Sequence, residues 1–367
     1  MHSLGIRPLW GQLIFPSSVH SFSKSPLVLQ NMLMKVRTMS AKPKGDSAFR
    51  TRLLAYLKDH GFDVKKINKI RENVYKIQTQ RRIYFFKGFS SFRKYETQKA
   101  LTKLLRQYGF YKTYKFLFDI QPFEHKGYYY GFIEYLKPHK EEFRFNTRKN
   151  RAEGLRVLGE LHRATGKIMN DQRFYYPIPK YNQIAKWKQR LEEFESVSHI
   201  VAQYVPEQVI NQAIMWGKWA IKGAKEHEIH LYQEPDVITH GDVAYHNFLR
   251  VQTGEVYLID WDLISKAPPI IDYLQFANRI LPSINYSYKE LWSYPAFRNL
   301  KNNPAFLYGL GFPSDIFREW NRLVRENLLA SQSHIHSVWK LTVEGFDNRI
   351  KFQEHLMERI AHMTGKR

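Results

Sequence analysis

The sequence predicts an α+β fold of two lobes: a small N-terminal lobe with an antiparallel sheet and one helix, and a larger, mainly helical C-terminal lobe. Strand-like runs surround one amphipathic helix before residue 136, whereas helical periodicity dominates from residue 146 onward. The chain has 367 residues and is 43% hydrophobic, which is enough to bury the cores of two lobes. We therefore expect residues 46–136 to form the N-terminal lobe and residues 137–367 the C-terminal lobe.

The first 45 residues differ from the rest because they contain Lys and Arg but no acidic residue before Asp46. They resemble a transit peptide only loosely, and they lack the apolar core and cleavage site of a secretory signal. Two interpretations remain open: a basic, disordered extension, or an upstream start with Met39 as the true beginning. We expect residues 1–45 to lie outside the folded lobes.

Composition excludes several classes of site. The chain has no cysteine, so disulfides, thiolate metal sites and cysteine nucleophiles are excluded. No run of eighteen apolar residues is present, so we expect no membrane span. For the location we expect the cytoplasm, with a spore coat as the alternative. The net charge of +23 favours polyanionic partners such as nucleotide phosphates, but no nucleic-acid-binding signature accompanies it.

The N-terminal lobe is predicted element by element. Apolar residues at helical spacing from Phe49 to Leu57, followed by Gly61, indicate a first helix with a glycine cap. The remaining segments are a hairpin, a helix and two strand pieces: residues 64–79 and Arg82–Gly88 joined at Gln78–Arg81, then Ser91–Tyr108, then Lys115–Phe118 and Tyr128–Leu136.

Lys87 and Glu96 are candidate functional residues of this lobe. A lysine at a strand end usually just reaches water, and a helical glutamate usually lies on a solvated face. Together, with a hairpin before them and a helix between, they match the layout of a kinase N-terminal lobe. A lysine can hold the α- and β-phosphates of a nucleotide, and a carboxylate beside it keeps the ammonium charged and oriented.

Helices are predicted through the C-terminal lobe. Leu155, Leu158 and Leu161 form an apolar stripe with His162 at its end, where we expect packing or capping rather than metal ligation. Further helices are expected at Gln183–Glu195 and Pro206–His230.

The segment from Val237 to Asp262 carries the strongest signal. It contains His-Gly-Asp at residues 240–242 and Ile-Asp-Trp-Asp at residues 259–262. Two short apolar strands with a Thr-Gly turn between them are expected to bring Asn247 and Asp260 together. Asp242 precedes Asn247 by five residues, in the loop that leads into this hairpin.

The residue types suit phosphoryl transfer. Magnesium takes hard oxygen ligands and keeps waters and phosphate oxygens, so one carboxylate (Asp260) and one amide (Asn247) suffice. An acceptor hydroxyl must lose its proton, which a carboxylate such as Asp242 can accept. The spacing matches kinase catalytic loops. The alternative is a structural polar hairpin without chemistry.

The segment resembles the aminoglycoside phosphotransferase and choline kinase superfamily, which has a protein-kinase-like fold and carries His-Gly-Asp, Asn and Ile-Asp-Trp-Asp. Within it, Asn73–Thr79, Phe86-Lys87 and the basic, Tyr-rich composition are similar to the CotS-like spore-coat branch. The resemblance covers roughly residues 49–355 and implies a kinase that uses ATP and Mg²⁺ to phosphorylate an alcohol group.

The resemblance also implies roles for individual residues. In the C-terminal lobe, Asp242 would be the catalytic base, His240 would organise the catalytic loop, and Asn247 and Asp260 would bind magnesium. Asp272 would support this loop from the next helix, and Asp262 would either assist the metal site or hold the loop.

For the nucleotide, the resemblance implies that Lys87 binds phosphates and pairs with Glu96. Residues 132–136 would form the hinge beside the base, with backbone groups around Glu134 and Leu136 reading adenine. The stretch Asn68–Tyr75, where protein kinases have a glycine-rich loop, contains no glycine.

Two functions remain open at this stage. The first is an ATP- and magnesium-dependent kinase acting on a hydroxyl of a small molecule or surface polymer. The second is a catalytically idle, kinase-fold structural protein of a spore coat, with other coat proteins as partners. Because the region after Asn285 is slightly basic, we expect that the acceptor is not a polycationic aminoglycoside.

Overall fold

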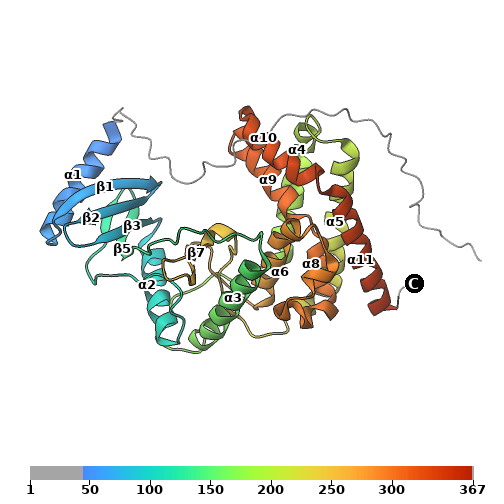
Figure 1. Cartoon of the computed structure of the whole chain (residues 1–367), viewed down its shortest axis with the longest axis horizontal. Helices are drawn as coiled ribbons and strands as arrows, with labels where there is room; N and C mark the ends of the chain where they lie inside the picture. The colour runs from blue at the N-terminus through green and yellow to red at the C-terminus, as the bar shows by residue number, and fades with distance from the viewer. Residues whose placement is uncertain (1–43, 366–367) are drawn as a thin grey trace, which may run out of the picture. The chain divides into compact units, whose positions relative to one another are not determined.

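The computed structural model describes residues 44–365 (Figure 1). The chain divides into two compact units, residues 1–51 and 52–367. The described residues of the first unit, 44–51, belong to helix α1 (Lys44–Asp59), so the last two residues of the expected extension are helical. The rest of that extension lies outside the described residues. Both predicted lobes from residue 52 onward lie in the second unit.

The N-terminal lobe contains a five-stranded antiparallel sheet in the order β1-β2-β3-β5-β4. Its elements are β1 (Val64–Arg71), β2 (Val74–Thr79), β3 (Ile83–Phe89), α2 (Phe92–Gln107), β4 (Phe123–His125) and β5 (Tyr128–Glu134). The predicted hairpin is confirmed as β2 and β3, which pair from Val74 opposite Lys87 to Gln78 opposite Ile83. The predicted first arm, residues 64–79, is in fact two strands, because β1 pairs with β2 as a separate strand; its mostly exposed, basic sequence lacks the apolar run that would mark it.

One predicted strand of this lobe is wrong. Lys115–Phe118 does not form a strand, because only an isolated bridge joins Phe116 to Ile133. The fifth strand is instead β4, which pairs with β5. The predicted helix is confirmed as α2, and the Ser91 side chain caps it by accepting a hydrogen bond from the backbone N–H of Lys94 at 3.2 Å.

Strand β3 is anchored by aromatic packing. Phe86 is fully buried, and its ring lies 4.9 Å from that of Phe132, on which Phe62 stacks at 4.5 Å. Because successive side chains of a strand point to opposite faces, the next residue, Lys87, projects from the other face of the sheet. The aromatic cluster therefore fixes the strand that presents this lysine.

The C-terminal lobe is mainly helical. Its helices are α3 (Arg148–Ile168), α4 (Gln183–Val201), α5 (Glu207–Glu226), α6 (Ile270–Ile280), α7 (Tyr288–Leu291), α8 (Pro304–Gly311), α9 (Ser314–Arg325), α10 (Gln332–Val343) and α11 (Phe346–Thr364). Its strands form two antiparallel pairs, β6 (Val237–Thr239) with β9 (Ser265–Ala267) and β7 (Phe248–Arg250) with β8 (Val256–Leu258). The predicted helices are confirmed as α3, α4 and α5, although α5 ends at Glu226 rather than His230.

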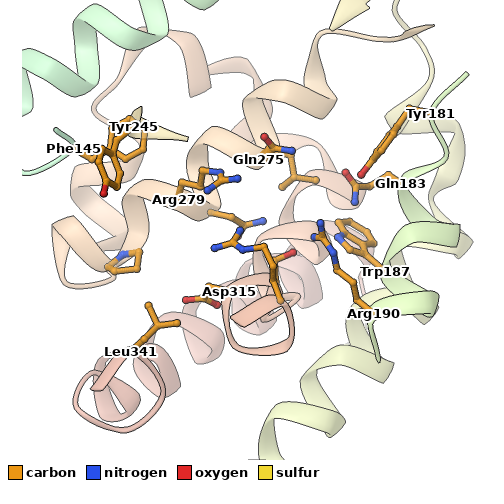
Figure 2. A pocket seen from close by; sticks show the side chains of 15 residues that line it. Phe145, Tyr181, Gln183, Trp187, Arg190, Tyr245, Gln275, Arg279, Asp315 and Leu341 are labelled. Carbon is orange, nitrogen blue, oxygen red and sulfur yellow. The ribbon is translucent and has the colours of Figure 1, made fainter. Parts of the chain in front are cut away.

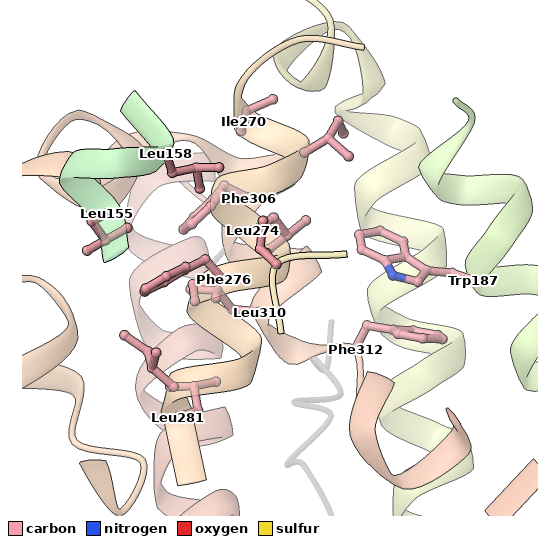
Figure 3. Packing of buried hydrophobic residues seen from close by; sticks show 14 of the residues in the cluster. Leu155, Leu158, Trp187, Ile270, Leu274, Phe276, Leu281, Phe306, Leu310 and Phe312 are labelled. Atoms are coloured by element: carbon pink, nitrogen blue, oxygen red, sulfur yellow. The ribbon is translucent and has the colours of Figure 1, made fainter. Parts of the chain in front are cut away.

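Helix α6 lies within the hydrophobic core of this lobe (Figure 3). Its buried residues Leu274 and Phe276 belong to the same cluster as Leu155 and Leu158, members of the predicted stripe on α3. Trp187 of α4 is 1% exposed in this cluster. Burying such side chains contributes about 1.5–3 kcal/mol each, which holds α6 in place. No described helix combines the length and apolarity needed to cross a membrane.

Candidate active site

The His-Gly-Asp loop follows strand β6 and is held by helix α6. Asp272 of α6 is fully buried and accepts hydrogen bonds from the backbone N–H groups of His240 (2.8 Å) and Gly241 (3.0 Å). His162 supports the same carboxylate at 2.9 Å. Gly241 has a φ of 76°, and a Cβ there would overlap the carbonyl oxygen of Leu263, so the loop requires glycine at this position.

His240 positions this loop rather than reaching toward a substrate. Its ring is fully buried, with Nε2 3.0 Å from the Ile259 carbonyl oxygen and Nδ1 3.3 Å from the backbone N–H of Asp242. Burial lowers the pKa of the His240 imidazole, which favours the neutral ring. In that form Nε2–H donates to Ile259 and Nδ1 accepts from Asp242, so both contacts are satisfied. The ring links the loop to the end of strand β8.

The hairpin brings the predicted trio together. The Asn247 amide Nδ2 donates to Oδ2 of Asp242 at 2.9 Å and to its carbonyl oxygen at 2.8 Å. At the other end of the hairpin, the Ile259 backbone N–H donates to the Asn247 carbonyl oxygen at 3.0 Å, directly before Asp260. Since Nδ2 is used in this way, the Oδ1 of Asn247 is the atom left to face a cation.

Lys87 joins the N-terminal lobe to this site. Its Nζ lies 3.0 Å from Oδ1 of Asp260 and 2.8 Å from Oδ1 of Asp262, and the lysine is 5% exposed. Burial would lower the pKa of Lys87, but Tyr114 and the two carboxylates raise it above its usual range. Burial would likewise raise the pKa of Asp260, but the charges of Lys87 and Arg71 hold it well below its usual range. Both partners are therefore charged at neutral pH.

The predicted pair of Lys87 with Glu96 is not formed. Glu96 instead accepts a hydrogen bond from the Tyr176 hydroxyl at 3.4 Å. The helix α2 residue that enters the cluster is Gln98, which is 2% exposed and donates to Oδ1 of Asp262 at 2.9 Å. Side chains two positions apart on a helix point in directions about 200° apart, so a small error in the orientation of α2 changes which polar residue faces the lysine.

Arg71 is a site residue that sequence reasoning missed. Its Nη2 donates to Oδ2 of Asp260 at 2.8 Å, across 189 residues of sequence, and no local pattern marks such a contact. Arg71 ends β1, beside the turn that occupies the place of the glycine-rich loop of protein kinases. Asn73 takes the left-handed conformation of that turn with a φ of 55°, and its side chain accepts from the Tyr130 hydroxyl at 2.7 Å. Asparagine tolerates this conformation better than most residues, which allows the turn to form without glycine.

The predicted hinge residues lie at and just after the end of β5. The backbone N–H of Glu134 already donates to the Lys115 carbonyl oxygen at 2.9 Å. The backbone groups of Leu136 make no hydrogen bond with any residue in the described part of the chain. Leu136 therefore offers the freer donor and acceptor of the two.

Asp242 has a second partner that was also missed. Nη2 of Arg279, two helical turns along α6 from Asp272, lies 2.5 Å from Oδ1 of Asp242. Arg279 also lines a pocket of about 200 Å³ between α4, α6 and α9 (Figure 2). The candidate base, Asp242, thus contacts both Asn247 and an arginine that lines this pocket.

The donor set fits a nucleotide and a divalent cation. Within residues 44–365 no cluster of three or more His, Asp and Glu side chains suits a metal ion. Magnesium, however, requires only one or two protein carboxylates when phosphates supply the other oxygens. Asp260 and the Asn247 amide oxygen meet that requirement, and Lys87 and Arg71 supply positive charge for phosphates.

The fold and this cluster define a phosphotransferase of the kinase-like class. The chain belongs to the phosphotransferase enzyme family that includes the aminoglycoside phosphotransferases, whose family model matches residues 63–298. The predicted enzyme class, a phosphotransferase, is thereby confirmed. No curated protein matches this chain.

Solved structures confirm the predicted fold class. An aminoglycoside phosphotransferase from Alicyclobacillus acidocaldarius is similar, with a TM-score of 0.64 and 17% identity over 82% of this chain and 93% of that one. Spectinomycin phosphotransferase in complex with ADP and spectinomycin has a TM-score of 0.56 and 16% identity over 84% and 98% of the two chains. The GDP complex of aminoglycoside 2'-phosphotransferase-IIIa has a TM-score of 0.54 and 14% identity over 84% and 98%.

Proposed function

We propose that this protein is an ATP- and magnesium-dependent phosphotransferase that phosphorylates a hydroxyl group of a small molecule or surface polymer. The observation that carries this proposal is the convergence of Lys87, Asp242, Asn247 and Asp260, from segments up to 173 residues apart, on one site. A purely structural hairpin has no physical need for such a set.

Each residue has a distinct role in the proposal. Lys87 and Arg71 hold phosphate oxygens, while Asp260 and Asn247 hold the cation. MgATP, when bound, supplies the phosphoryl group and neutralises charge on it. Asp242 orients the acceptor hydroxyl and takes its proton, and the neutral His240 keeps the Asp242 backbone in place. The nucleotide complexes of the similar phosphotransferases are in keeping with these roles.

The test is transfer of labelled phosphate from ATP to a panel of hydroxyl compounds, with nucleotide binding measured separately by calorimetry. Asp242→Asn should lower kcat by about 10²- to 10⁴-fold, because a general base is lost. Its affinity for MgADP should stay within about twofold of wild type, since Asp242 makes no phosphate contact in the proposal. The control is Asp119→Asn, the same change at a 97% exposed side chain. Equal rates for wild type and Asp242→Asn would contradict the assigned role.

A structural role in a spore coat is the second candidate, and it comes from the similarity to the CotS-like branch. Exposed aromatic side chains favour it, because they can pack against neighbouring coat proteins: Tyr175 is 77% exposed and Tyr111 is 58% exposed. This role predicts no magnesium-dependent ATP binding and unchanged coat assembly for Asp260→Ala. Magnesium-dependent binding that Asp260→Ala abolishes would instead favour the enzyme, located in the cytoplasm or on the coat.

A further inference from the structure

The pocket beside Asp242 is lined by three arginines from three helices: Arg190 of α4, Arg279 of α6 and Arg318 of α9. Figure 2 shows Arg190 and Arg279 approaching the same space from different helices. We call this site the arginine pocket. Its volume of about 200 Å³ suits a small polar group rather than a drug-sized ligand.

The positive charge in this pocket is only partly balanced. The one carboxylate among its lining residues, Asp315, is already held by Arg349 through two contacts of 3.0 and 2.7 Å. The Arg190 guanidinium forms no ion pair or hydrogen bond with any residue that the structure describes; only the Arg190 carbonyl oxygen is used, by the Asn321 side chain. Nε of Arg279 is buried and has no hydrogen-bond partner within the described chain, although Nη2 reaches Asp242.

Arg318 has one carboxylate nearby. Its Nε donates to Oε1 of Glu319 at 2.8 Å, and Glu319 is shared with Arg322 at 2.9 Å. The remaining guanidinium nitrogens of Arg318 make no hydrogen bond with the described residues. Each of the three pocket arginines therefore keeps donor groups for an added anion.

The arginines also repel one another. Burial, together with the charge of Arg318, lowers the pKa of Arg279 to about 10 and lowers that of Arg190 below its usual range. Like charges that line one partly desolvated pocket are unfavourable unless an anion lies between them. Guanidinium groups bind phosphate and carboxylate through paired hydrogen bonds, so the arrangement is suited to an oxyanion.

We propose that the arginine pocket binds the acceptor substrate through a phosphate or carboxylate group, which places the hydroxyl to be phosphorylated beside Asp242. This inference rests on the proposed function. It assigns the acceptor to the class of small anionic hydroxyl compounds, such as hydroxy acids or sugar phosphates. It also agrees with the expectation, drawn from the basic sequence after Asn285, that the acceptor is not a polycationic aminoglycoside.

The first experiment measures thermal unfolding of the full chain in inorganic phosphate or glycerol 3-phosphate, against sodium chloride at equal ionic strength. Both phosphates should raise the unfolding temperature of the wild type. Arg190→Gln should weaken phosphate binding about tenfold or more, as expected for a lost charged hydrogen bond. Lys188→Gln, the same charge change at an exposed site on α4, should respond like the wild type.

A second readout separates binding from a structural role. Without added anion, Arg190→Gln should unfold at the same temperature as the wild type or higher, because it relieves repulsion. A lower unfolding temperature for Arg190→Gln, or equal phosphate effects in wild type and Arg190→Gln, would overturn the proposal. The same phosphate titration in the presence of saturating MgADP tests whether the nucleotide's own phosphates occupy the arginine pocket. If MgADP displaces inorganic phosphate, the pocket is part of the nucleotide site and the proposal is overturned.

Transfer assays distinguish this inference from the proposed function. Matched pairs, glycerol 3-phosphate with glycerol and glucose 6-phosphate with glucose, compare anionic with neutral acceptors, and kanamycin supplies a cationic one. Faster phosphate transfer to the anionic compound of a pair supports the inference. Faster transfer to a neutral or cationic compound overturns the inference but leaves the proposed kinase function intact. Phosphate binding that depends on Arg190 without magnesium-dependent ATP binding would support the pocket and contradict the kinase.

Discussion

Lys87 Nζ lies 3.0 Å from the Oδ1 of Asp260, so the buried lysine of the sheet forms a direct ion pair with the carboxylate proposed to bind magnesium. These two residues come from the two lobes and are separated by 173 residues. A phosphate oxygen bound to Lys87, or a cation bound to Asp260, would replace this contact. The ion pair therefore marks where the nucleotide should bind.

Lys87→Met is expected to weaken binding of MgADP by roughly 10- to 100-fold, because a charged hydrogen bond contributes about 1.5–3 kcal/mol. Isothermal titration calorimetry checks this. Lys103→Met is the matched control, since Lys103 is an exposed lysine on α2. Affinities within twofold of each other in the two variants would mean that Lys87 does not contact the nucleotide.

Replacing Gln98 should cost more stability than replacing Glu96. Gln98→Leu removes one of the two hydrogen-bond donors to Asp262, leaving Lys87 as the other, and should destabilise the fold by about 1–3 kcal/mol. Glu96→Gln changes only a long contact with Tyr176 and should cost less than about 0.5 kcal/mol. Urea unfolding of both variants measures the loss in the free energy of unfolding. A larger loss for Glu96→Gln than for Gln98→Leu would contradict the assignment of Gln98 as the α2 residue that supports the cluster.

Gly241→Ala should be strongly destabilising, and Gly254→Ala provides a matched comparison. Both glycines have positive φ, 76° and 90°, which costs an alanine about 1–2 kcal/mol. A Cβ at residue 254 meets nothing within 4 Å, whereas one at residue 241 overlaps the Leu263 carbonyl, which adds about 1–3 kcal/mol of steric cost. Thermal or urea unfolding should separate the two variants by this extra amount, and equal losses would show that the loop can shift freely.

The Asp315–Arg349 ion pair should make stability depend on pH. Burial would raise the pKa of Asp315, but Arg349 outweighs it and holds this pKa below its usual range. Because the pKa is lower in the folded state, the pair stabilises fully above the unfolded value of about 3.9, and this stability is lost as pH falls through the folded pKa.

Asp315→Asn should therefore destabilise the protein by about 3–5 kcal/mol at pH 7, since it leaves a buried guanidinium unpaired. Its difference from the wild type should shrink below about pH 4. Urea unfolding from pH 7 to pH 3 tests both points, with exposed Asp59→Asn as the control. A difference that stays constant down to pH 3 would contradict the pKa direction.

The parts of the site that sequence reasoning predicted are local in the chain. Asn247 and Asp260 flank one short hairpin, so a turn signal between two apolar strands was enough to bring them together. Gly241 and Asp242 lie in the loop before it. The helical stripe of α3 and the β2–β3 hairpin were likewise predictable, because periodicity determines which face of an element is apolar.

The parts of the site that sequence reasoning missed depend on which neighbouring element packs against each polar face. Periodicity placed both Glu96 and Gln98 on α2, but only the packing of α2 against the cluster turns Gln98 toward Asp262. Arg71 reaches Asp260 from the end of β1, and β1 itself has no apolar run that would reveal this contact.

The sequence by itself thus determined the class of fold, the His-Gly-Asp loop and the placement of Asn247 and Asp260 at the two ends of one hairpin, since these follow from contacts between neighbouring segments. Only the tertiary structure decided that Lys87 meets Asp260, and that Arg190, Arg279 and Arg318 converge beside Asp242. The physical reason is that side chains on separate helices are brought together by core packing, which depends on the volumes and shapes of many buried residues at once.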